Sequence, residues 1–410
     1  MRDQPVGSEQ LPNSWPTGIT RVVFYAPRIP EMSGGSVAIE NLADGFSRYG
    51  VDVEFLSQFP GSGREPHHTA RVILKHPRWH KGPVLRGGHT LRAKARAMPR
   101  LLAKRSELTI ARRRLRRLMN SYGPETAVVF SHVKTKTFLD STGYLPRADG
   151  PLLIGQHHSQ FESLVDEPSL REALPLHFGD IDAFTTLTDE DAHKFEHLIP
   201  APCFGVANPL QAGWTPSFAS RPNKAVALAR FSHEKQLDLM VRAFARATAA
   251  PDLSEWTLDI YGSGKEEGRI RSAIEASGSQ GRIRLMGPTT SPETVYRQAA
   301  ITLSSSNLEG FGLTILEAAA CGTPSLAFDC SPGVRSLIRP DTGLLVRPLT
   351  EEAYAQALRG ALSDPDRLAQ MGRAASERAQ QFSPDRIVDR WGAILSEAER
   401  QHSRRFSSAG

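Results

Sequence analysis

Cysteine is scarce in this chain of 410 residues. None of its three copies, Cys203, Cys321 and Cys330, lies within a few residues of another. Zinc sites use cysteines at short paired spacings, and disulfide scaffolds need a much higher cysteine density. The sequence therefore excludes both classes. Such cysteine usage is typical of a reducing compartment.

Long apolar stretches are also missing. The polar, proline-containing residues after Met1 lack the 7–15-residue apolar region of a secretory signal. No uninterrupted apolar run approaches the ~20 residues that a membrane-spanning helix needs. We therefore predict a cytoplasmic protein, with peripheral attachment to the inner face of the cell membrane as the alternative.

Acidic residues are rare in one region. From Arg64 to Arg117 the chain carries 17 Lys and Arg but only Glu65 and Glu107, a local charge of +15, although the whole chain has a formal charge of +6. The positive charge is thus a patch, which indicates an anionic partner. An anionic membrane surface, a groove for an anionic polymer and a merely solvated basic face remain alternatives. The patch has only Trp79 and the nearby Tyr122 as aromatic residues for base stacking, so we expect no nucleic acid partner.

The overall composition, 40% hydrophobic and 23% charged, is that of a globular protein, and the length predicts two or three domains. Short β-branched runs alternate with helical segments in both halves. We therefore predict an α/β protein with two facing, doubly wound, Rossmann-like domains and a C-terminal helix that crosses between them. Ligands of such sheets bind beyond the carboxyl ends of the strands, so the cleft between the halves is the expected site.

Composition changes give the expected boundaries, with a proline-rich stretch between the two halves. The predicted segments are a flexible leader (1–18), a first Rossmann-like domain (19–205), a linker (206–222), a second Rossmann-like domain (223–382), a crossover helix (383–401) and a tail (402–410).

The segment from Ser304 to Pro324 carries the clearest chemical pattern. A strand ends, a turn with Gly310 and Gly312 follows, and a helix begins near Leu313. Glycines allow a ligand to approach the backbone closely, and the free N–H groups of a helix start favour phosphate oxygens. This turn therefore predicts a site for a phosphorylated ligand.

Two glutamates flank that turn. Glu309 precedes the helix start and Glu317 lies about one turn inside it, and carboxylates accept hydrogen bonds from hydroxyl groups. The arrangement suits a diphosphate with a sugar at one end and a ribose at the other.

The run from Glu309 to Gly312, then Glu317 and the residues Ala320-Cys321-Gly322-Thr323-Pro324, resembles the signature of the retaining glycosyltransferases of family 4, including poly(glycerol-phosphate) alpha-glucosyltransferase-like enzymes. The resemblance extends from Thr20 to Trp391 and implies the two-domain GT-B fold. It also implies that Glu309 contacts the hydroxyls of the donor sugar and that Glu317 binds the ribose. The backbone that would hold the diphosphate belongs to Phe311, Gly312 and Leu313.

Further segments match the same family. The loop from Leu228 to Gln236 resembles one with an arginine–lysine pair, which implies that Arg230 and Lys235 neutralise the pyrophosphate. In the first half, the resemblance implies that a glycine loop abuts the diphosphate and that one of two adjacent histidines approaches the sugar. The residues concerned are Gly34 and Gly35 for the loop, His157 or His158 for the histidine, and Gly262, Gly264, Met286 and Gly287 for the nucleotide pocket. The loop that begins at Cys330 departs from the glycine-first loop of the family.

The resemblance implies transfer of a hexosyl unit from a UDP- or GDP-sugar to an acceptor hydroxyl with retention of configuration. The leaving phosphate would accept the acceptor's proton, and His157 or His158 would position the sugar. Since Arg230, Lys235 and the helix start supply positive charge, we expect no metal and no cofactor besides the nucleotide sugar. Expected acceptors are a cell-envelope glycan, a polyol-phosphate polymer or a lipid-linked molecule.

Other functions remain as alternatives. One is a glycosyltransferase of the same fold that acts on small molecules or natural products, and another is a non-catalytic protein that binds nucleotide sugars. A nicotinamide-dependent dehydrogenase is disfavoured because Gly268 falls one residue too late to complete a G-x-G-x-x-G motif with Gly262 and Gly264.

Overall fold

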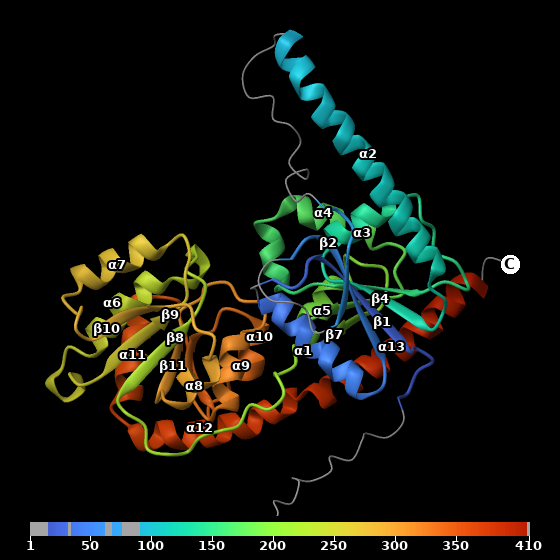
Figure 1. The fold of residues 1–410 in the computed structure, drawn as a ribbon. Helices are drawn as coiled ribbons and strands as arrows, with labels where there is room; N and C mark the ends of the chain where they lie inside the picture. The colour runs from blue at the N-terminus through green and yellow to red at the C-terminus, as the bar shows by residue number, and fades with distance from the viewer. Residues whose placement is uncertain (1–14, 32–33, 62–67, 76–90, 408–410) are drawn as a thin grey trace, which may run out of the picture.

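The computed structural model describes residues 15–31, 34–61, 68–75 and 91–407, without the side chains of residues 91–103. Figure 1 shows two α/β units side by side, with the long helix α13 running beneath the first of them. Each unit is built on a parallel β-sheet. This confirms the predicted α/β fold with two doubly wound domains.

The first sheet has the strand order β3-β2-β1-β4-β5-β6-β7. Strands β4 and β5 are buried along their whole length, as expected for parallel strands with helices on both faces. The order reverses between β1 and β4, which is where ligands of such sheets bind. The strands are β1 (Arg21–Arg28), β2 (Asp52–Phe59), β3 (Thr69–Val72), β4 (Thr126–Phe130), β5 (Leu152–Gln156), β6 (Ala183–Thr186) and β7 (Cys203–Gly205).

Helices cover both faces of this sheet. Helices α1 and α13 share a hydrophobic cluster on one face, and helices α2 to α5 pack on the other. Their bounds are α1 (Gly34–Arg48), α2 (Leu91–Ser121), α3 (Val133–Asp140), α4 (Pro168–His177), α5 (Asp189–Phe195) and α13 (Pro384–Ser407), with the 3-10 turn η2 (Phe161–Val165). Helix α2 is the 31-residue helix before β4, and its N-terminal part stands out from the domain (Figure 1).

The second sheet repeats the same order with one strand fewer, β10-β9-β8-β11-β12-β13, and its order reverses between β8 and β11. Its strands are β8 (Lys224–Leu228), β9 (Thr257–Tyr261), β10 (Ile283–Gly287), β11 (Ile301–Ser304), β12 (Ser325–Phe328) and β13 (Gly343–Val346). The helical segments around it are η3 (His233–Lys235), α6 (Leu237–Ala247), η4 (Pro251–Leu253), α7 (Glu267–Ala276), α8 (Pro292–Arg297), α9 (Leu313–Ala320), α10 (Pro332–Leu337), α11 (Glu351–Leu362), α12 (Pro365–Ala379) and η5 (Gln380–Phe382).

The chain returns to the first domain at its C-terminal end. Helix α12 packs on α9 of the second domain, and α13 then buries Val388, Trp391 and Leu395 in the core of the first domain. This is the predicted crossover helix. Among the described residues, no helix combines the length and the hydropathy of a membrane span.

Two predicted boundaries need correction. Residues 402–407, predicted as part of a tail, continue α13, because buried His402 hydrogen bonds Asp182 and the carbonyl of Arg147. Residues 15–18 of the predicted leader are packed, since the ring of Trp15 lies 5.7 Å from that of Phe46. The rest of the leader and residues 408–410 lie outside the described residues.

Candidate active site between the two domains

Loops at the carboxyl ends of the two sheets meet across the domain boundary. A Cβ atom on Gly310, in the loop after β11, would lie 2.5 Å from the carbonyl oxygen of His158, which follows β5. A Cβ on Gly34 would lie 3.6 Å from the side chain of Leu313, and one on Gly35 would lie 4.0 Å from the ring of His158. The structure therefore brings together the predicted glycine loop, histidine loop and α9 start.

The start of α9 depends on glycine. Gly312 has a φ of 96°, in the left-handed region that favours glycine, and it directly precedes Leu313. Gly333, in the first turn of α10 and in the segment that departs from the family pattern, packs so closely on Gly310 that a Cβ would lie 2.3 Å from the Gly310 carbonyl oxygen. The departing loop thus supports the turn that exposes the N–H groups of α9.

Lys235 and Glu309 form an ion pair at this site, with 2.5 Å between Nζ and Oε2. Lys235 ends the turn η3 after β8, and Glu309 follows β11, so the pair joins the loops of two neighbouring strands. Both side chains are about four-fifths buried, with 20% and 19% of their surface exposed. A cation and a carboxylate are therefore held together beside the start of α9.

Arg230 is more open, with 69% of its side chain exposed. Its guanidinium lies 2.9 Å from a carboxylate oxygen of Glu234, which also accepts a hydrogen bond from Ser232. The carbonyl of Glu234 accepts a hydrogen bond from the backbone N–H of Asn307, which fixes this loop against the loop of Glu309. Arg230 thus stands at the rim of the same site, partnered by a carboxylate.

The two adjacent histidines lie in different surroundings. The ring of His157 packs edge-on against Phe195 at 5.2 Å, and burial lowers its pKa to about 3. His158 lies by Gly35, and both of its ring nitrogens are buried without a hydrogen-bond partner. Burial and, to a lesser extent, the charge of His132 lower the pKa of His158 to about 4, so His158 is neutral at physiological pH. A neutral imidazole can donate one hydrogen bond and accept another.

Glu317 sits inside α9 and accepts a hydrogen bond from the hydroxyl of Tyr296, 3.3 Å away. Burial raises the pKa of Glu317 to about 7. Tyr296 is fully buried and comes from α8, so it connects two helices on this face of the second sheet. Glu317 is therefore only partly ionised near neutral pH.

The remaining predicted residues divide into two groups. Gly262 and Gly264 pack against the loop of Arg230. A Cβ added to Gly262 would lie 1.9 Å from the carbonyl oxygen of Ala229, and one added to Gly264 would lie 2.3 Å from the carbonyl oxygen of Phe231. Both glycines support that loop. Gly287 has open space beside it, and Met286 is 46% exposed, so these two leave room for a ligand.

Acidic residues near the cleft are engaged with other groups. An Asp-x-Asp sequence, Asp189 to Asp191, follows β6. The carboxylate of Asp191 accepts hydrogen bonds from the hydroxyl of Thr188 and the backbone N–H of Phe161. Asp189 forms an ion pair with Arg390. Within the described part of the chain, no group of three or more His, Cys, Asp or Glu side chains is placed to hold a metal ion.

Sequence reasoning missed Glu234, Tyr296 and Gly333. Glu234 and Tyr296 have no motif of their own, because their importance comes from partners that only the fold brings close. Gly333 had a signal, since it lies in the loop flagged as different from the family.

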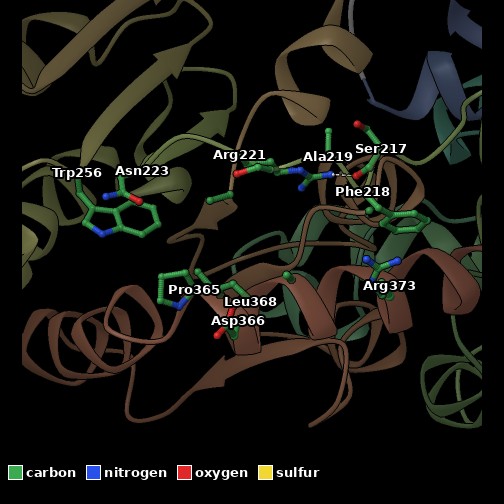
Figure 2. A pocket seen from close by; sticks show the side chains of 14 residues that line it. Ser217, Phe218, Ala219, Arg221, Asn223, Trp256, Pro365, Asp366, Leu368 and Arg373 are labelled. Carbon is green, nitrogen blue, oxygen red and sulfur yellow. Dashed lines mark hydrogen bonds between the residues drawn. The ribbon is translucent and has the colours of Figure 1, made fainter.

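A separate hollow of about 260 Å³ lies at the opposite edge of the second sheet (Figure 2). Asn223 and Trp256, which precede β8 and β9, line it, so it faces the amino ends of the strands. Arg373 stacks on Phe218 there at 4.8 Å. None of the predicted site residues lines this hollow.

Residues 215–378 match the family model described as glycosyl transferases group 1. This stretch of the chain is therefore similar to the group 1 glycosyltransferases. The matched stretch contains Arg230, Lys235, Glu309 and Glu317, whereas the predicted donor-binding residues Gly34 and Gly35 lie before it.

Two curated relatives match over longer stretches. An exopolysaccharide phosphotransferase of Streptomyces coelicolor is 32% identical over 253 residues, which is 60% of this chain and 26% of that protein. A poly(glycerol-phosphate) alpha-glucosyltransferase of Bacillus subtilis is 30% identical over 179 residues, 43% of this chain and 26% of that protein. The chain thus spans about a quarter of the length of each relative.

A solved structure covers nearly the whole chain. The Anabaena protein HepE in complex with UDP aligns with a TM-score of 0.72 and 14% identity over 92% of this chain and 99% of that chain. This likeness, together with the two parallel sheets, confirms the GT-B fold.

Proposed function

We propose that this group 1 domain works with the first domain as a retaining, metal-independent glycosyltransferase. The enzyme would move a hexosyl unit from a UDP- or GDP-sugar to a hydroxyl of a cell-envelope polymer. The observation that carries the proposal is the close Lys235–Glu309 pair beside the glycine turn and the N-terminus of α9. The name of the Bacillus subtilis relative and the UDP in the HepE structure support the acceptor class and the donor class.

The geometry suggests how the donor enters. Lys235 contacts Glu309 and Arg230 contacts Glu234, so both cations are held by carboxylates. A diphosphate carries more negative charge than one carboxylate and would draw the cations to itself, helped by the N–H groups that begin α9. Glu309 would then be free to accept hydrogen bonds from the sugar hydroxyls.

The chemical step would rely on charge that is already in place. Breaking the bond between the anomeric carbon and the phosphate oxygen puts negative charge on the leaving diphosphate, which Lys235, Arg230 and the α9 start stabilise. The acceptor hydroxyl oxygen forms its bond to the anomeric carbon on the face that the diphosphate leaves. The leaving phosphate takes the proton of that hydroxyl. His158 is neutral, so it would orient the sugar by hydrogen bonding and carry no charge.

The acceptor would bind to the first domain, at the cytoplasmic face of the membrane. An anionic polyol-phosphate polymer fits the positive patch between Arg64 and Arg117 better than a neutral glycan does. An anionic membrane surface is the second partner that this patch would suit.

The test is turnover of a panel of nucleotide sugars without added metal, with poly(glycerol phosphate) as acceptor and release of nucleoside diphosphate as readout. Lys235→Ala and Glu309→Ala should each lower kcat/KM by about 100-fold or more, as loss of a group that stabilises transition-state charge does. Glu377→Ala is the control, since Glu377 is exposed on α12.

Full activity of either site variant would refute the residue roles. Nucleotide binding without turnover of any acceptor or water would instead favour a non-catalytic nucleotide-sugar-binding protein. A requirement for divalent metal would overturn the metal-independent chemistry.

A further inference from the structure

The exposed side of α2 carries arginines that have no acidic partner among the described residues. Arg105, Arg113, Arg114, Arg116 and Arg117 are exposed, and none of them forms an ion pair with another described residue. The one acidic side chain in this part of the helix, Glu107, accepts a hydrogen bond from the backbone N–H of Lys75. Unpaired positive charge of this density favours an anionic partner.

The apolar side of the same helix is already used. Ala111, Leu115 and Met119 are buried against the first domain, and Leu118 packs beside them. Among the described side chains of α2, Ile110 is a large apolar group left exposed, at 47%. An interfacial helix inserts an apolar face into lipid, and this part of α2 has no such face to offer.

The arginines also point in several directions. Each position on an α-helix turns by about 100°, so Arg105 and Arg114, which are nine positions apart, project from roughly opposite sides and cannot both face one flat surface. A flexible chain of negative charges can follow such a distribution around the helix, whereas a planar membrane meets only one side of it.

The helix leads toward the edge of the sheet where the candidate site lies. Ala111 packs on Phe59, the last residue of β2, so α2 reaches the carboxyl edge of the first sheet at that point. The helix begins at Leu91 and therefore continues about 30 Å beyond this edge. Figure 1 shows this extension standing clear of the domain.

We infer that α2 is a docking arm for an anionic polymer, which binds a part of the acceptor chain remote from the hydroxyl that reacts. The inference rests on the proposed function, because it assigns the arm to the acceptor. The ligand class is a phosphodiester-linked polyol, held through its phosphates by guanidinium groups. An acceptor long enough to reach both the arm and the cleft gains affinity from two linked contacts, and a single unit does not.

The test compares the triple variant Arg113→Gln/Arg116→Gln/Arg117→Gln with a matched triple variant, Arg339→Gln/Arg359→Gln/Arg367→Gln. The second set is exposed on the other domain, forms no ion pair with a described residue and removes the same charge. Binding of fluorescently labelled poly(glycerol phosphate) is measured by anisotropy at low and high salt. Turnover is measured with that polymer and with single glycerol phosphate.

The arm variant should bind the long polymer about tenfold more weakly, with a shallower salt dependence. Its KM for the long polymer should rise, while its turnover of single glycerol phosphate and its donor hydrolysis stay at wild-type levels. The matched variant should behave as wild type throughout.

Unchanged polymer affinity in the arm variant, or an equal loss in the matched variant, would overturn the inference. If the wild type cosediments with anionic vesicles and the arm variant does not, while both bind the polymer equally well, the inference is overturned in favour of a membrane partner. Absence of donor hydrolysis and turnover in the wild type would refute the proposed function alone, because polymer binding is measured without catalysis.

Discussion

The proposed contact between Glu317 and the ribose predicts that nucleotide affinity depends on pH. Burial raises its pKa to about 7, so lowering the pH from 8 to 6 converts most of it to the neutral acid. A ribose hydroxyl donates a stronger hydrogen bond to a carboxylate than to a carboxylic acid. The Kd for UDP should therefore be up to about tenfold higher at pH 6 than at pH 8, as isothermal titration would measure.

Glu317→Gln is the control for this effect, because phosphate groups of the nucleotide titrate in the same range. The variant should bind UDP more weakly at pH 8 and show a flatter pH profile than wild type. Since the folded-state pKa lies above that of an exposed glutamate, ionisation of Glu317 also destabilises the free protein, and the variant should have a higher Tm at pH 8. Identical pH profiles would contradict the role of Glu317.

The sequence could identify single residues only where a motif marks them. Lys235 and Glu309 are 74 residues apart, yet each was predicted from the pattern around it, and the structure places them in contact. Counting along the strand from Pro151 favours His157 but does not exclude His158, because neighbours at a strand end face opposite sides and the pattern does not say which side faces the cleft. The ring of His157 packs on Phe195, whereas His158 contacts the domain boundary.

Among the elements, α13 depends on its last turns for attachment to the first domain. Asp182 is buried, and its carboxylate is bound by Arg405 at 2.7 Å and by His402 at 3.1 Å. Arg405→Ala would leave Asp182 with His402 as its remaining α13 partner. The free energy of unfolding should fall by about 2 kcal/mol, below the full cost of a broken buried pair, because Arg405 is partly exposed and one contact remains.

Arg404→Ala is the matched control, since Arg404 is exposed and adjacent in sequence. It should change the free energy of unfolding by less than about 0.5 kcal/mol in urea denaturation. Equal stabilities of the two variants would show that the buried Asp182 contact does not anchor the helix.

The sequence predicted the order of elements well and their ends less well. Alternating strands and helices determine a parallel sheet, and the apolar period of α13 is clear as far as Leu395. Beyond that residue the helix is held by His402 and Arg405, whose partners lie more than 200 residues earlier. A local pattern contains no information about such contacts, which is why the tail was predicted to start at 402.

At the scale of the whole molecule, the packing of the two domains follows from contacts that no motif encodes. Gly310 touches the backbone of His158, and Leu187 joins a hydrophobic cluster with Phe311 and Leu337 of the second domain. Both contacts join residues of the first domain to residues of the second domain. The sequence could place both edges at the cleft but could not say which residues touch.

An ion pair between the domains should affect how readily the cleft opens. Arg335 on α10 lies 3.2 Å from Glu190 on α5 and 2.9 Å from Asp329, and Asp329 also binds Arg347 at 2.8 Å. Removing Arg335 deletes the contact with Glu190 across the domains together with the contact to Asp329. Removing Arg347 deletes only a contact within the second domain, so Arg347→Ala is the matched control for Arg335→Ala.

Exposed pairs contribute about 0.2–1 kcal/mol, so Arg335→Ala should shift the ratio of closed to open molecules by a factor between about 1.4 and 5. Small-angle scattering of the donor-free protein should give a larger radius of gyration for this variant than for Arg347→Ala. The KM for the donor should rise by a similar factor with little change in kcat, because closure precedes chemistry. High salt should move the wild type toward the variant, since screening weakens an exposed pair. If both variants scatter alike and share one KM, the pair between Arg335 and Glu190 does not hold the domains closed.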